Sequence, residues 1–337
     1  MTDVVITCDN HQLSIPNQAS TALSLDHHAG EFRQPNSRTP QTITSVDSYL
    51  RASIAENTRR AYRSDIQHFI RWGGQLPTSP EFVAQYLADH GERLSPFTLA
   101  RRLVSLTRAH EMMGHSNPCA SHLVQATMKG IRRVRGLAQR QVEPILREDL
   151  LLMLDLLSNT TQGIRDRALL LVGFCGAFRR SEIAAIRIGD VRFVPEGLTI
   201  RLPHSKTDQE GEGRTVAIPR GRSTACAVRA LEAWVARASI VDGAIFRRID
   251  KGGKVLASGI SGATVALIVK KSVARTGLDA KKFSGHSLRA GLATSAAKCG
   301  ASSWKIREQT GHRSDSMLRR YIRDGELFNN NAAGTVL

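Results

Sequence analysis

Helical spacing of apolar residues dominates this chain, and it gives way to alternation in one region. From Tyr62 to Ile131 apolar residues recur three and four positions apart, and helical patterns return from Leu150 to about Arg187. Alternation, which is typical of strands, begins near residue 191 and ends near residue 218. The sequence therefore predicts a mainly α-helical protein with a small antiparallel β-sheet.

The first half of the chain is predicted to form four short helices. Serine before proline favours a helix start, and paired glycines favour a helix end. Because the connections are short, these helices are expected to pack as a small bundle. The signals for their ends are Asn57 or Thr58, Gly73-Gly74, Ser79-Pro80, Ser95-Pro96 and Ser121.

Composition divides the sequence into five predicted segments. The first is rich in Ser, Thr, Gln, Asn and His and lacks periodicity, which predicts a disordered tail. Basic residues gather from Lys129 to Arg147, and we interpret this stretch as an inter-domain linker that attracts phosphates or as a solvated helix end. The segments are a tail (1–42), a helical domain (43–135), a basic linker (136–145), a mixed α+β domain (146–325) and a C-terminal tail (326–337).

The second domain is predicted to combine helices with a short run of strands. A polar, Gly-rich loop at residues 205–214 separates the last two strands. Gly300 and Gly311 are suited to end helices, and Ser302 and Ser314 to begin them. The predicted strands are 191–193, 198–202 and 215–218, and the predicted helices are 150–157, 164–172, 178–187, 222–238, 259–276, 287–298, 303–310 and 315–323.

The charge of the chain favours a polyanionic partner. Lys and Arg number 47 against 30 acidic residues, for a net charge of +17, which favours a nucleic acid partner over an otherwise ordinary basic enzyme. The five cysteines are scattered without a CxxC motif, so a reducing, cytoplasmic location is expected. No apolar run approaches the ~20 residues that span a bilayer, and no membrane partner is expected.

A tyrosine near the C-terminal end, Tyr321, carries the functional hypothesis. A phenol with a pKa near 10 is mostly protonated at neutral pH, and it needs a base before it can attack phosphorus. Arginines would neutralise the phosphate, an imidazole could take the proton, and a mobile lysine could protonate the leaving oxygen. The other candidates for these tasks are Arg179, Glu182, Lys206, His286, Arg289 and His312.

Each of these residues also has an ordinary structural interpretation. Arginines are usually solvated, and Glu182 lies three residues from Arg179, where a surface ion pair would be worth little. A single histidine such as His286 is more often a satisfied structural residue. Lys206 lies in a turn, where a lysine often has no role. The order and spacing of the whole set therefore matter more than any member.

That ordered set resembles the tyrosine recombinases of the phage integrase family. Residues 176–182 (GAFRRSE) resemble the first box of the family, and residues 286–289 (HSLR) resemble the second. Gly311-His312 followed by Tyr321 resembles the third box, and Lys206 matches the hairpin lysine of the family.

One position departs from the commonest family pattern. Arg180 stands where the family usually has an apolar residue, so two adjacent arginines compete for the catalytic role. We assign it to Arg179, which keeps the spacing to Ser181 and Glu182. The resemblance extends over roughly residues 45–325 and is most similar to the Cre-type arrangement, a helical core-binding domain followed by a mixed α+β catalytic domain of the DNA breaking-rejoining type.

The resemblance implies a mechanism. Tyr321 attacks a DNA phosphate to give a 3′-phosphotyrosine, while Arg179, Arg289 and His312 hold the phosphoryl oxygens. His286 assists deprotonation of the phenol, Lys206 protonates the leaving 5′-oxygen, and Glu182 supports the pocket. A 5′-hydroxyl of a partner strand then attacks the linkage. Neither a cofactor nor a metal ion is implied, and four protomers are expected to assemble on two DNA sites.

Basic residues of the helical domain and linker are expected to contact DNA. Most such contacts position the protein on the backbone and do not read bases. A relaxing topoisomerase and a DNA-binding protein without catalysis remain alternatives, which the separate helical domain and the complete catalytic set respectively disfavour. The candidate contacts are Arg59, Arg60, Arg63, Thr98, Arg101, Arg102, Arg108, Lys129, Arg132 and Arg133.

Overall fold

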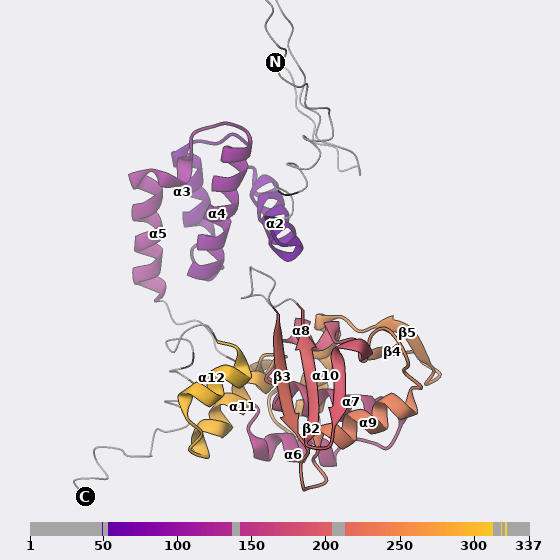
Figure 1. Cartoon of the computed structure of the whole chain (residues 1–337). Coiled ribbons are helices and arrows are strands. Elements are labelled where there is room, and N and C mark those ends of the chain that lie inside the picture. The colour runs from indigo at the N-terminus through magenta and orange to yellow at the C-terminus, as the bar shows by residue number, and fades with distance from the viewer. Residues whose placement is uncertain are drawn as a thin grey trace, which may run out of the picture. The chain divides into compact units, whose positions relative to one another are not determined.

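Two units are visible in the computed structural model of the chain, Met1–Leu137 and Ala138–Leu337 (Figure 1). The structure describes residue 49, the ranges 53–136, 142–203 and 213–312, and residues 318 and 321. We call the two parts the first unit and the second unit, and each is described by itself. Within the described residues, no helix is both long enough and apolar enough to cross a membrane.

The first unit is a helical bundle, as the spacing predicts. Ser79, Ser95 and Ser121 each accept a hydrogen bond from a backbone N–H of the first turn that follows, so all three predicted caps are confirmed. Gly73 takes a left-handed conformation with φ of 109° and ends the first helix. The elements are α2 (Glu56–Trp72), α3 (Pro80–His90), α4 (Pro96–Met112), the 3-10 turn η1 (Pro118–Ala120) and α5 (His122–Arg135).

One helix start differs from the prediction, and one helix end decides between two interpretations. Helix α2 begins at Glu56 after Ala55, whose side chain makes no capping bond, so neither Asn57 nor Thr58 is the cap. Helix α5 ends at Arg135, where the helical domain was predicted to end, so the basic residues from Lys129 to Arg135 form a helix end. Its apolar side chains Val124 and Met128 are buried and hold it on the bundle, which favours helix over linker.

The bundle encloses a core of aromatic and aliphatic side chains. Phe69 and Tyr86 meet edge-to-face with ring centroids 5.1 Å apart. Leu87, Leu99 and Leu106 are fully buried beside them. The apolar stripes read from the sequence therefore face one another.

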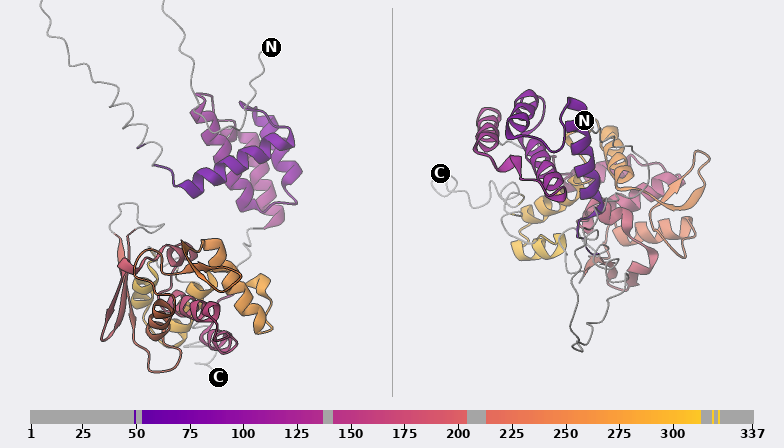
Figure 2. Two further views of the ribbon diagram at one scale, coloured as in Figure 1. Left: turned by 90° about the vertical axis from the view of Figure 1, so that its right-hand side faces the viewer. Right: turned by 90° about the horizontal axis from the view of Figure 1, so that it is seen from above.

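The second unit packs helices on one face of a three-stranded sheet, as the two side views agree (Figures 1 and 2). Helix α7 (Thr161–Cys175) is its central element, since residues 168–172 are at most 2% exposed. The other helices are α6 (Arg147–Asp155), α8 (Arg180–Ala185), α9 (Ala227–Arg237), α10 (Gly262–Arg275), α11 (Ser287–Lys298) and α12 (Ser303–Thr310), with 3-10 turns η2 (Ile188–Asp190) and η3 (Ala280–Lys282).

The sheet is antiparallel with strand order β1-β2-β3. The strands are β1 (Val191–Val194), β2 (Gly197–Leu202) and β3 (Arg214–Pro219), and Leu202 pairs with Arg214 where β2 and β3 meet their connecting loop. Alternation sends Leu198, Ile200, Val216 and Ile218 into the core. A second ribbon, β4 (Arg247–Ile249) with β5 (Val255–Gly259), was not predicted, because its strands are short and lack alternating polarity.

The end of the predicted linker belongs to the second unit. The backbone N–H of Glu143 donates to the carbonyl of Lys282, and that of Ile145 donates to the carbonyl of Ser287. The Ile145 side chain is fully buried. A Cβ on Gly291 would lie 1.7 Å from the Ile145 carbonyl oxygen, so this close approach requires glycine.

The last helices begin and end where predicted. Helices α11 and α12 have the expected bounds, and the side chain of Ser302 caps α12. Gly311 ends α12 with φ of 65°. Leu318 and Tyr321 are helical, whereas Ser314 and the rest of the predicted helix 315–323 lie outside the described residues.

Candidate active site

Six of the seven predicted catalytic residues lie within the described part of the second unit. They come from three places in the sequence that the fold brings to one site, as the contacts below show. The six are Arg179 and Glu182 at α8, His286 and Arg289 at α11, and His312 and Tyr321 after α12. Lys206 lies outside the described residues.

Arg179 and Glu182 are joined by the geometry of a helix start. Arg179 is the N-cap residue of α8, and Glu182 occupies the third helical position. One carboxylate oxygen accepts the backbone N–H of Arg179 at 2.8 Å, and the other accepts its guanidinium Nη1 at 2.6 Å. Because Glu182 is only 5% exposed, this is a buried and oriented pair, not the surface pair considered from sequence. Arg180 follows on α8 and is exposed.

Arg289 is the most buried cation of the site, with 1% of its surface exposed. Its Nη1 donates to the carbonyl of Ala177 at 2.8 Å. Ala177 has a left-handed φ of 49°, which costs about 1 kcal/mol for a residue with a side chain. Nε and Nη2 of Arg289 are buried without a hydrogen-bond partner in the part of the chain described. Burial and the nearby Arg179 lower the pKa of Arg289 to about 10.

His286 and Tyr321 are in direct contact. The Nε2 atom of His286 lies 3.0 Å from the phenolic oxygen of Tyr321. His286 precedes α11, and its backbone N–H donates to the hydroxyl of Ser284. Desolvation of the ring, with the charges of Arg289 and Arg179, lowers the pKa of His286. A neutral imidazole at neutral pH can accept the phenolic proton at this distance.

His312 is held in a defined orientation. Its ring centroid lies 6.0 Å from that of Tyr321, and its Nδ1 lies 2.7 Å from the hydroxyl of Thr310. That hydroxyl donates to the carbonyl of Ile306 at 2.7 Å, so it must accept from Nδ1–H of His312. The neutral tautomer therefore leaves Nε2 without a proton. Burial and the surrounding cations, Arg289 and Arg179 first, lower the pKa of His312 to about 3.

A third arginine in the site was missed by the sequence reasoning. Arg214 begins β3, and its Nη2 lies 3.5 Å from a carboxylate oxygen of Glu182. Burial lowers its pKa, and Glu182 opposes that shift. The sequence signal was weak, because one arginine after a Gly-rich loop is common in so basic a chain. Two guanidinium groups thus pair with one carboxylate, and its charge also acts on Arg289, so the cations exceed the acid in a way suited to an anion.

Comparison with known proteins agrees with this geometry. The model of the phage integrase family matches residues 144–326, just over half of the chain. An integrase/recombinase xerD homolog from Selenomonas ruminantium is 42% identical over 293 residues, which cover 84% of this chain and 86% of that protein. The chain belongs to the phage integrase family. It is accordingly a tyrosine-type site-specific recombinase.

Other relatives of this integrase agree in sequence and in fold. Recombinase cre of Escherichia phage P1 is 26% identical over 269 residues, covering 74% of this chain and 77% of that protein. A lambda integrase dimer bound to a COC′ core site is similar in structure, with a TM-score of 0.58 at 18% identity over 86% of this chain and 78% of that chain. The Tn1549 transposon integrase, in complex with a circular intermediate DNA, also gives a TM-score of 0.58 at 14% identity over 83% of this chain and 93% of that chain.

The predicted DNA contacts of this integrase fall into two groups. Most are exposed cations on α2, α4 and α5, where solvent and phosphate can reach them, although Arg101 also bonds the buried carboxylate of Asp65. Arg59 and Arg108 form exposed ion pairs with Glu56 and Glu111, and such pairs are weak enough to exchange partners. The exposed residues are Arg59, Arg60, Arg63, Arg101, Arg108, Lys129, Arg132 and Arg133, whereas Thr98 is half-buried and bonded to Ser95.

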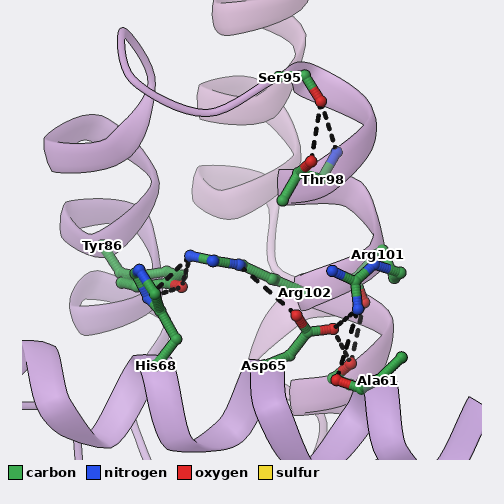
Figure 3. Close-up of polar contacts among 9 residues, drawn as sticks. Ala61, Asp65, His68, Tyr86, Ser95, Thr98, Arg101 and Arg102 are labelled. Carbon is green, nitrogen blue, oxygen red and sulfur yellow. Dashed lines mark hydrogen bonds and ion pairs between the residues drawn. The ribbon is translucent and has the colours of Figure 1, made fainter. Parts of the chain in front are cut away.

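Arg102 does not fit the predicted role. It is 8% exposed, and its Nη1 donates to the phenol of Tyr86 at 2.6 Å and meets Nδ1 of His68 at 2.8 Å (Figure 3). Its Nε faces Asp65 at 3.7 Å, and Arg101 bonds the same carboxylate from the other side at 2.6 Å. Arg102 therefore ties α4 to α2 and α3, and we remove it from the candidate DNA contacts.

Proposed function

We propose that this integrase cleaves and rejoins double-stranded DNA through a covalent 3′-phosphotyrosine on Tyr321. The phenolate oxygen of Tyr321 forms a bond to phosphorus, and the bond from phosphorus to the 5′-oxygen breaks. The phenolic proton passes to Nε2 of His286, which the 3.0 Å contact between these two atoms supports. That contact is the single observation on which the proposal depends.

Arg179 and Arg289 bind the phosphoryl oxygens. Glu182 fixes the orientation of Arg179, and the two unpartnered N–H groups of Arg289 are buried donors in need of an acceptor. The developing charge of the transition state is spread over those oxygens, so fixed donors stabilise it more than they stabilise the ground state. A bound phosphate also opposes the cations that hold the pKa of His312 low, and a protonated His312 would donate from Nε2.

Lys206 protonates the leaving 5′-oxygen. Its place in the sequence between β2 and β3 matches the hairpin lysine of the family, and a sulfur substitution tests the role. A 5′-bridging sulfur leaves without an acid, so such DNA should restore cleavage by Lys206→Ala and not by Arg289→Ala. Equal failure of both variants on the sulfur substrate would remove Lys206 from this role.

Strand exchange follows when a 5′-hydroxyl from a second DNA site attacks the phosphotyrosine. Cleavage replaces the bond from phosphorus to the 5′-oxygen with a bond from phosphorus to Tyr321, and rejoining reverses this exchange. The bond energy therefore stays in the covalent intermediate. Four protomers on two sites would carry out the exchange, each using both of its units to contact DNA. Relatives with solved structures are bound to a core site and to a circular intermediate DNA, which supports duplex DNA as the partner.

The test begins by recovering the DNA site. Wild-type protein is incubated with fragmented genomic DNA, denatured, and the DNA that stays attached is sequenced. A nicked duplex built on that sequence should trap wild type covalently. Tyr321→Phe should bind the duplex with equal affinity and give no adduct. Failure of wild type to form any adduct would favour a DNA-binding protein without catalysis, and cleavage without site preference would favour a relaxing topoisomerase.

A further inference from the structure

Arg214 occupies a position in the site that its exposed neighbours on β3 do not. Its side chain is 19% exposed, whereas Thr215 and Ala217 on the same strand are exposed. Its Nη1 donates to the backbone carbonyl of Gln309 at 3.0 Å, near the end of α12. Its Nη2 lies 3.5 Å from Oε2 of Glu182, which is an ion pair without a hydrogen bond, and its Nε and Nη2 are buried without a hydrogen-bond partner among the described residues. One guanidinium thus contacts both the start of α8 and the end of α12.

The same guanidinium packs against the turn that carries His312. A Cβ on Gly311 would lie 2.9 Å from Cζ and Nη1 of Arg214, closer than real side chains come. Gly311 also has a left-handed φ of 65°. The backbone conformation therefore favours glycine there, and any larger residue would also displace the guanidinium of Arg214. The position of His312 depends on this turn.

Gln309 strengthens the same junction. Its side-chain Nε2 donates to the carbonyls of Cys175 at 2.8 Å and Ala217 at 3.1 Å. The end of α12 is thereby attached to β3 and to the end of α7, which leads into Arg179. Arg214 supplies the one charged link between Glu182 and α12 among the described residues.

We propose that Arg214 is a positioning residue that holds the Glu182–Arg179 pair and the Gly311–His312 turn in register with each other. The inference rests on the proposed cleavage reaction and deepens it. Glu182 receives two bonds from Arg179 and the charge of Arg214, so its carboxylate cannot rotate away. Loss of Arg214 would free both the carboxylate and the turn.

A purely stabilising role is the alternative, and kinetics separates the two. Arg214→Met keeps the length of the side chain and removes the charge and the donors. At saturating nicked duplex its rate of adduct formation should fall by about 10²-fold, because small displacements of reacting groups cost that much. The duplex concentration that gives half of the maximal rate should stay unchanged. Arg220→Met is the matched control, since Arg220 follows β3 and pairs with Glu232 at the surface.

Two further variants keep the test decisive if Arg214→Met folds poorly. Arg214→Lys retains the charge without the fork and should recover part of the rate. The double variant Arg214→Met/Glu182→Gln should lose less rate than the product of the two single losses, since part of the effect of Arg214 acts through Glu182. Thermal unfolding of each variant gives the folded fraction by which its rate is corrected.

Three results would overturn the proposal. They are a corrected rate for Arg214→Met equal to that of Arg220→Met, a loss that appears only in the half-saturating concentration of DNA, or multiplicative effects in the double variant. The proposed function fails separately. If wild type forms no adduct, cleavage itself is refuted, whereas normal cleavage by Arg214→Met with an active wild type refutes only the positioning role.

Discussion

Two buried arginines, one in each unit, show what pairing does to the role of a charge. Arg102 in the first unit directs Nη1 at Tyr86 and His68 and faces the carboxylate of Asp65. Arg289 in the second unit donates one hydrogen bond, to the carbonyl of Ala177, and has two buried N–H groups without a hydrogen-bond partner in the described chain. Both positions are helical, and the sequence predicted contact with DNA for both, Arg289 as a catalytic residue and Arg102 as a binding residue. The pairing distinguishes a structural arginine from one available to a ligand.

The difference extends to the charges around each arginine. In the first unit, Asp65 accepts from Arg101 and from Ser105 and faces Arg102 at 3.7 Å, so the buried charges are paired although Nε of Arg102 has no hydrogen-bond partner in the described chain. In the second unit, Arg179 and Arg214 pair with Glu182, the charge of Glu182 also acts on Arg289, and the lowered pKa of each histidine keeps both neutral at neutral pH. An excess of buried positive charge costs folding free energy unless an anion binds. The excess positive charge of the second unit therefore lowers its folding stability and leaves the site able to bind an anion.

Arg289→Met tests the difference between the two arginines most directly and should have the largest effect. Removal of unpartnered buried donors should lower the rate of adduct formation by about 10³-fold, since oxyanion donors are worth that much in transition-state stabilisation. The free energy of unfolding should stay the same or rise by about 1 kcal/mol, because a buried charge without a carboxylate is removed. Urea unfolding and the nicked-duplex assay measure the two quantities. A large loss of stability would show that Arg289 is paired like Arg102.

Arg102→Met should have the opposite outcome. Tyr86, His68 and Asp65 lose a shared partner, so the free energy of unfolding should fall by about 2 kcal/mol. The adduct rate at saturating DNA should not change, since Arg102 lies away from the reacting groups. Arg108→Met is the control, because its exposed pair with Glu111 is worth less than about 0.5 kcal/mol. A stability loss no larger than that of the control would contradict the structural role.

Sequence reasoning found the helices, and it predicted six site residues that lie in the described second unit, because these depend on local signals. Ser79, Ser95 and Ser121 cap their helices through contacts within one turn, and the box residues keep fixed local spacing. The role of Arg102 depends on contacts with helices 16 and 34 residues away in sequence, which no local pattern encodes. Arg214 was missed for the same reason, since its bond to Gln309 spans 95 residues.

The acidic side of the pH scale offers a third test. His312 has a pKa lowered to about 3 in the folded chain, whereas its ordinary pKa is 6.5. Between these pH values the imidazole is protonated in the unfolded chain and neutral in the folded chain. Stability is therefore lost as pH falls from 6.5 toward 3, by about 1.4 kcal/mol per pH unit from this group. Between pH 7 and pH 5 the wild type should lose about 2 kcal/mol more than His312→Asn in urea unfolding. Parallel losses in the two proteins would mean that His312 is accessible to protons in the folded state.

The smallest expected effect concerns the exposed cations and separates them from Arg102. Arg132→Gln should weaken binding to all duplexes by a similar small factor, and it should reduce the slope of log affinity against log salt by about 0.9, because one fewer counterion is released. Arg102→Met, measured where it is folded, should leave that slope unchanged because a buried guanidinium neutralises no phosphate. An equal change of slope in both variants would show that Arg102 contacts DNA. Burial in the free protein would then not decide which arginines contact the phosphates.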